Sequence, residues 1–210
     1  MNKRIYLSLA FGWMLVATPA HSSLIYTLDQ DGCTGTCGTG PFGQVTLEQT
    51  TASLVTVTVT LKPGEVFAGT GAGEALEFNV GTPVTMAGFS AGFGVGPALD
   101  KVASFGTFLD SVTCTGCKGG QNTNPAGPLA FTITSASGIG IADFRPNAKG
   151  YYFSVNLIGT NGNGGNVAAI APLAAAAVAG SSVPEPVSAS LIGIGLVAIG
   201  LSRRFSRRSR

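Results

Sequence analysis

The segment from Val55 to Leu61 constrains the fold of this chain more than any other. Aliphatic Val55, Val57 and Val59 alternate there with threonines 56, 58 and 60. Strict alternation is typical of a β-strand with one buried face, and β-branched residues on both faces suit a strand. The turn residues Lys62-Pro63-Gly64 then end it. The chain must therefore build a sheet whose valine face is covered by a second layer.

Further strands are expected at 24–28, 75–80, 84–89, 105–114, 129–134 and 151–158. Glycine or proline separates most of them, at intervals typical of sandwiches and barrels. One helical turn is expected at 143–148, and the glycine- and asparagine-rich segment 160–166 is expected to be a hairpin loop. The sequence predicts a single all-β domain over residues 23–172, with a sandwich or jelly-roll-like architecture.

The N-terminus has the three parts of a secretory signal peptide. Basic Lys3 and Arg4 precede an apolar stretch from Ile5 to Val16, and small and polar residues follow it. Cleavage after Ser22 is expected, with cleavage after Ala20 as the alternative. Residues 1–22 are therefore interpreted as a signal peptide that exports the β-domain.

The C-terminus combines a rigid polar motif, an apolar run and a basic end. After an alanine-rich linker at 173–182 come Val183-Pro184-Glu185-Pro186 and the apolar residues 187–201. The two prolines keep the motif extended and outside the following helix. The run is short for a membrane span, for which about 20 residues are usual. The chain ends with Arg203, Arg204, Arg207, Arg208 and Arg210. These arginines should hold the far end of a transmembrane helix on the cytoplasmic side.

This tail, residues 183–210, resembles the PEP-CTERM sorting signal of Gram-negative bacteria. The resemblance implies recognition of Pro184-Glu185-Pro186 by the membrane-embedded protease exosortase, cleavage close to the motif, and release or attachment at the cell surface. It also implies an association with exopolysaccharide production. The expected function is that of a non-enzymatic surface or matrix protein, with a structural or adhesive role in a biofilm. The expected partners are exosortase, the inner membrane and exopolysaccharide.

The charge of the expected exported part argues against nucleic acid as a partner. Between residues 23 and 183 there are five lysines and arginines and nine aspartates and glutamates, a net charge of −4. Such a domain has no basic patch to displace counterions from phosphates. The only histidine, His21, lies in the expected signal peptide. Its removal would exclude Ser-His-Asp and Cys-His sites and histidine-ligated zinc, and no cofactor or metal is expected.

Four cysteines form two close pairs, Cys33 with Cys37 and Cys114 with Cys117. An even number of cysteines in an exported protein favours disulfides, and a bond within each close pair is the expected connectivity. Cross-links between the two loops are the main alternative. A zinc site of four thiolates or a thioredoxin-like redox pair fits the compartment and the surrounding pattern less well.

Two other functions stay open at the level of the sequence. A carbohydrate-binding module could use exposed rings from Tyr151-Tyr152-Phe153 and Asp/Asn loops, and a carboxylate-dependent hydrolase could use a pair among the nine acids. Asp29 and Asp31 hint at calcium, but the rest of a binding loop is missing, so a solvated turn is expected there.

Overall fold

The computed structural model describes residues 22–69, 74–117 and 124–173. The prediction of an all-β domain is confirmed, since the only helix in these ranges is the short 3-10 helix η1, Ile141–Asp143. The described residues contain no helix long and apolar enough to cross a membrane. The predicted signal peptide up to residue 21, the linker from residue 174 and the sorting signal lie outside the described residues.

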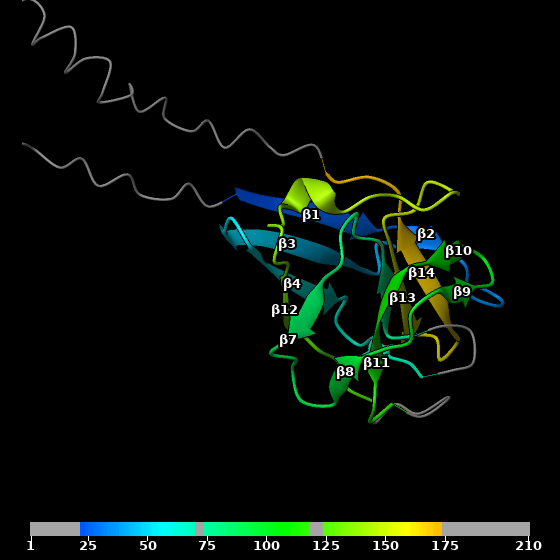
Figure 1. The fold of residues 1–210 in the computed structure, drawn as a ribbon. Helices are drawn as coiled ribbons and strands as arrows, with labels where there is room; N and C mark the ends of the chain where they lie inside the picture. The colour runs from blue at the N-terminus through cyan, green and yellow to red at the C-terminus, as the bar shows by residue number, and fades with distance from the viewer. Residues whose placement is uncertain (1–21, 70–73, 118–123, 174–210) are drawn as a thin grey trace, which may run out of the picture. The chain divides into compact units, whose positions relative to one another are not determined.

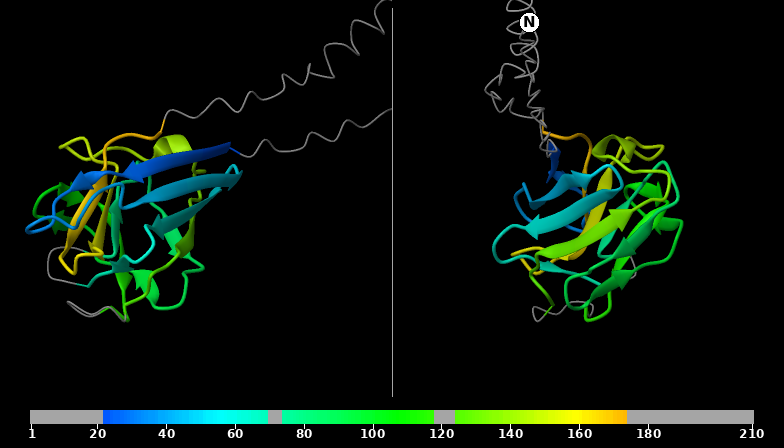
Figure 2. Two further views of the ribbon diagram at one scale, coloured as in Figure 1. Left: turned by 180° about the vertical axis from the view of Figure 1, so that it is seen from behind. Right: turned by 60° about the vertical axis from the view of Figure 1, so that its left-hand side comes forward.

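Five strands form the first sheet, in the order β1-β3-β4-β12-β7 (Figure 1). All neighbours are antiparallel. The strands are β1 (Ser22–Leu28), β3 (Gly43–Thr51), β4 (Leu54–Leu61), β12 (Leu129–Thr134) and β7 (Thr85–Ala87). The right view of Figure 2 brings this sheet toward the viewer.

Seven strands form the second sheet, in the order β2-β14-β13-β6-β11-β8, with β5 paired to β13. They are β2 (Gln30–Asp31), β14 (Gly164–Ala169), β13 (Phe153–Ile158), β6 (Leu76–Phe78), β11 (Asp110–Cys114), β8 (Phe93–Val95) and β5 (Val66–Phe67). Both sheets are open, so each keeps two edge strands.

The main core lies between the two sheets. Val55, Val57 and Val59 of β4 are fully buried, as their alternation with threonine predicts. Rings join the layers: Tyr26 of β1 lies 4.8 Å from Phe153 of β13, measured between ring centroids. Phe78 of β6 likewise lies 6.0 Å from Phe131 of β12. The first sheet thus turns its valine face to the second, and its threonine face points away from the core.

A third layer covers the other face of the second sheet. It is a hairpin of β9 (Asp100–Val102) and β10 (Gly106–Phe108). Val102, Phe105 and Phe108 pack there with Ala168 of β14, which is fully buried although it points away from the main core. At β6, β13 and β14 both faces of this sheet are therefore shielded from water, which determines the environment of the polar side chains on their covered face.

Residues 105–114 do not form the single strand that was predicted. β10 and β11 are separate, with a break at Leu109, because the Leu109 N–H donates to the side-chain oxygen of Asn79 at 2.9 Å instead of continuing a ladder. The two strands consequently belong to different layers.

The predicted helical turn at 143–148 is also displaced. The turn lies at η1, where the Asp143 carboxylate accepts the Gly140 N–H at 2.8 Å. Phe144 then forms an isolated bridge with Val80, which requires extended backbone. The loop expected at 160–166 does connect two strands of a hairpin, but β14 already begins at Gly164.

Candidate functional site

The Cys33–Cys37 disulfide closes a small loop that is organised by Asp31. The two Cα atoms are 5.5 Å apart, in agreement with the pairing that was favoured. The Asp31 carboxylate accepts the backbone N–H of Cys33 at 2.9 Å and that of Cys37 at 3.1 Å, and it also accepts the hydroxyl of Thr36. An aspartate that holds its own turn in this way is a structural residue.

This arrangement also bears on the calcium hint at Asp29 and Asp31. Asp31 does lie near two other potential metal ligands, but these are the sulfurs of Cys33 and Cys37, which are bonded to one another. The Asp29 carboxylate accepts the side-chain amide of its neighbour Gln30 at 2.9 Å. The two aspartates are engaged separately, as expected of a solvated turn.

The turn between β13 and β14 is a support for the disulfide loop. Asn161 and Asn163 donate side-chain hydrogen bonds to the carbonyl oxygen of Thr36, at 3.0 and 2.9 Å. Gly165 lies so close to Cys33 that an added Cβ would come within 2.7 Å of the Cys33 Cα. The glycines and asparagines of this segment therefore bring two distant parts of the chain together.

The second disulfide joins Cys114, at the end of β11, to Cys117, with 5.3 Å between their Cα atoms. This is again the pairing within a close pair that was favoured. Gly69 packs against Cys117, where a Cβ would approach the cysteine Cβ to 3.1 Å. The described thiols are thus all in structural disulfides.

The tyrosines considered for sugar stacking are engaged in packing. Tyr151 meets Phe105 edge-on, with ring centroids 4.8 Å apart, and Tyr152 lies 5.1 Å from Tyr26. Phe153 is fully buried. None of the described aromatic side chains is among the exposed large hydrophobic residues. Tyr151 and Tyr152 are thus partly exposed side chains that each pack against another ring.

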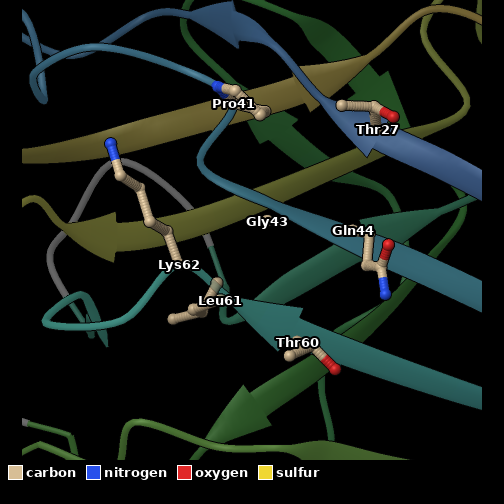
Figure 3. A pocket seen from close by; sticks show the side chains of 7 residues that line it. All are labelled: Thr27, Pro41, Gly43, Gln44, Thr60, Leu61 and Lys62. Carbon is tan, nitrogen blue, oxygen red and sulfur yellow. The ribbon is translucent and has the colours of Figure 1, made fainter.

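A shallow pocket of about 330 Å³ lies at one end of the first sheet (Figure 3). Thr27, Gln44, Thr60 and Lys62 supply its polar side chains. The Lys62 ammonium donates to the carbonyl oxygen of Thr39 at 2.7 Å, which fixes the end of that side chain. Hydroxyl, amide and ammonium groups can hydrogen-bond a neutral or anionic polar ligand, but they include no general base for hydrolysis.

Glu65 is buried just behind the turn that carries Lys62. Its side chain is 1% exposed, and one of its oxygens has no hydrogen-bond partner. Burial raises the pKa of this carboxyl to about 7, against a smaller lowering by the Lys62 ammonium. Glu65 therefore changes its charge near neutral pH.

Glu77 is the most unusual ionisable group of the described residues. It lies in the centre of β6, on the face that the third layer covers, with Ser111 and Ser154 opposite it on the neighbouring strands. It is 0% exposed, and neither carboxyl oxygen has a formed hydrogen bond. Burial raises its pKa well above the ordinary value, and the nearby carboxylates of Asp100 and Glu74 add to the rise. The Ser154 hydroxyl and the backbone of Glu74 oppose the rise, although neither forms a hydrogen bond of normal geometry with the carboxyl oxygens. The sequence identified Glu77 only as one of nine acids.

The residues predicted to form the sorting motif, Val183 to Pro186, and the five C-terminal arginines lie outside the described residues. The chain matches no family model. No curated protein and no solved structure matches it either.

Proposed function

We propose that this chain is an exported, non-enzymatic protein that is held briefly in the inner membrane by its C-terminal segment and sorted by exosortase to the cell surface. The observation that carries the proposal is the fixed order of Pro184-Glu185-Pro186, the apolar residues 187–201 and the arginine-rich end. The apolar run can enter a bilayer, and the arginines orient it with the motif on the opposite side. An enzyme in the membrane can then cleave at the motif.

Two features of the β-domain support export. Its strands run from Ser22, the last residue of the proposed signal peptide, to Ala169, before the proposed linker and sorting signal. Its disulfides each join cysteines three or four residues apart, a chemistry that persists in oxidising compartments. We regard the two stacked sheets as a β-sandwich, because their facing sides share one core and neither sheet closes on itself.

The open face of the first sheet supports a structural or adhesive role toward exopolysaccharide. Threonine dominates the outward side of β4 and recurs on β3 and β12, and Glu48 is the one charged residue that these three strands present outward. A wide, nearly uncharged face of hydroxyl groups can hydrogen-bond a neutral polysaccharide without the cost of burying charges. An enzymatic role finds less support, because Glu77, the carboxyl with the most perturbed pKa, cannot reach an external substrate.

Sorting is tested by the intact mass of the protein from its native host, with envelope and medium fractions compared. A species that begins near Ser23 and ends near Pro186 is expected. In the Pro184→Ala, Glu185→Ala double variant, the uncleaved form should accumulate in the envelope. A wild-type species that keeps Arg203 to Arg210 in every fraction would overturn exosortase processing and leave a tail-anchored protein.

Adhesion is tested separately by co-sedimentation of the processed protein with exopolysaccharide from the same host. Thr58→Lys and Thr132→Lys place bulky charges on the open face and should reduce binding several-fold. Lys149→Glu, on the far side of the domain, is a charge-changing control that should leave it unchanged. Equal binding by all three variants would rule out this face.

A further inference from the structure

The starting observation is a carboxyl group that is fully buried and has no hydrogen bond. Glu77 projects from the centre of β6 between two serines, and its two oxygens are both unpartnered. Both serines have other hydrogen-bond partners: the Ser154 hydroxyl accepts the side-chain amide of Asn166 at 3.1 Å, and the Ser111 hydroxyl donates to the carbonyl oxygen of Pro97 at 2.6 Å. Buried carboxylates in proteins are normally paired with a cation, hydrogen-bonded or bound to a metal ion. The structure gives Glu77 neither a cation partner nor a hydrogen bond.

Two further carboxylates lie close to Glu77, where the covering hairpin meets β6. Asp100, the first residue of β9, accepts the backbone N–H of Glu74 at 3.2 Å, so it is fixed beside the start of β6. The described charged groups that act on Glu77 are these two, Asp100 and Glu74, and both are acidic. Each of them is only partly buried. They would therefore give an ion a route from solvent to the buried carboxyl.

Protonation of Glu77 alone does not explain why three carboxyl groups lie near one another here. A protonated Glu77 would gain an O–H donor, and a buried donor also needs a partner, which the present geometry does not supply. It would not offset the negative charges of Asp100 and Glu74. A bound divalent cation would satisfy both oxygens of Glu77 and offset all three carboxylates.

We propose that Glu77, Asp100 and Glu74 form a calcium site that ties the β9–β10 hairpin to the second sheet. Carboxylate oxygens are the preferred ligands of Ca²⁺, and its tolerance of irregular geometry suits ligands from two layers better than the strict octahedron of Mg²⁺. The carboxylate oxygens of these three residues do not all lie within 4.8 Å of one another. Among the described residues, only the possible ligand atoms of Asp31, Cys33 and Cys37 lie that close together. Binding therefore draws β9 toward β6. Because every ligand lies in the β-domain, the site is independent of the sorting proposal.

The test is the thermal unfolding midpoint of the full-length protein in EDTA, in 10 mM CaCl₂ and in 10 mM MgCl₂, with bound calcium counted after dialysis. Extracellular calcium modules have Kd values of roughly 10⁻⁴–10⁻³ M. At that affinity, mass action predicts a midpoint roughly 4–8 °C higher in CaCl₂ than in EDTA for a domain of this size. One calcium per chain is expected.

Glu77→Gln is the deciding variant. It should lose the calcium response and the bound ion. Its midpoint in EDTA should equal or exceed that of the wild type, because glutamine removes the cost of burying an ionisable carboxyl. Asp100→Asn, which keeps an acceptor for the Glu74 N–H, should lose the response as well and serves if Glu77→Gln does not fold. Glu48→Gln, on the open face of the first sheet, should respond like the wild type.

Three results would overturn the proposal. One is a wild-type midpoint that is the same in EDTA and CaCl₂, with no calcium retained, which would mean that Glu77 holds a proton. Another is a calcium response that survives in both Glu77→Gln and Asp100→Asn. The third is an equal response to MgCl₂ and CaCl₂ in all variants, which is the result expected of ionic strength.

Discussion

Replacing Glu65 by glutamine should change how the stability of the domain depends on pH. The Glu65 side chain is 1% exposed, and burial raises its pKa from an ordinary 4.5 to about 7. The folded state therefore binds more protons at this group than the unfolded state between these two values. Stability from Glu65 is fully present below pH 4.5 and is lost as the pH rises through 7. Glutamine cannot ionise, so the variant should not show this loss.

The magnitude follows from the size of the pKa change. Each pKa unit corresponds to about 1.4 kcal/mol, which gives an upper value of about 3 kcal/mol for the loss. Solvent near the carboxyl screens the effect, and we expect about 1–2 kcal/mol. The assay is urea unfolding in EDTA from pH 4 to pH 8.5. The free energy of unfolding of Glu65→Gln minus that of the wild type should rise by this amount across the range.

The prediction concerns how the difference in free energy of unfolding between variant and wild type changes with pH. Any constant cost of the new amide shifts this difference equally at every pH, so it does not affect the result. Glu48→Gln is the matched control, because Glu48 is exposed on the outward face of β3. Its difference from the wild type should vary little with pH. A difference for Glu65→Gln that is flat from pH 5 to pH 8 would refute the reasoning, as would one that falls.

Three more changes test the packing, each by urea unfolding. Phe153→Ala removes a fully buried ring that contacts rings of both sheets, and it should cost about 3–5 kcal/mol. Gly43→Ala should cost roughly 2–3 kcal/mol, because Gly43 has a φ of 151° and an added Cβ would collide with the Thr60 carbonyl oxygen. Gly94→Ala is the control: Gly94 has open space around it, so its replacement should change the free energy of unfolding by no more than about 0.5 kcal/mol. Serine at both Cys33 and Cys37 should cost about 2 kcal/mol, since the closed loop is short; a cost above 4 kcal/mol would show that the disulfide does more than close its loop.

The alternation of valine and threonine in β4 was a sufficient signal for that strand and for the direction of its buried face. Residues 129–134, predicted as a strand, match β12 at both ends. Local patterns sufficed there because each strand faces the core on one side and water on the other. The close spacing of the cysteines likewise favoured the pairing that the structure has.

Six strands were missed, namely β2, β3, β5, β8, β9 and β14. For β3 and β14, the two longest of them, the reason can be identified. β3 does alternate at Val45 and Leu47, but its polar residues and its start at a glycine weaken the pattern. β14 begins with Gly164 and Gly165, which are typical of a turn. Gly165 is needed within a strand because Cys33 packs directly against it. The requirement comes from a residue far away in the sequence, so no local pattern could indicate it.

Glu77 shows the main limit of the sequence. Alternation along residues 76–78 assigns Leu76 and Phe78 to one face and Glu77 to the other, and a polar residue opposite a core face is normally solvated. The hairpin of β9 and β10, some 25 residues later in the chain, covers that second face and excludes water from it. The local pattern therefore predicts the direction of the Glu77 side chain, whereas its environment depends on a layer formed by a later part of the chain. A carboxyl kept at such a position costs free energy that serine or threonine would not. The proposed calcium site explains this cost, because the bound ion would tie the covering hairpin to the second sheet.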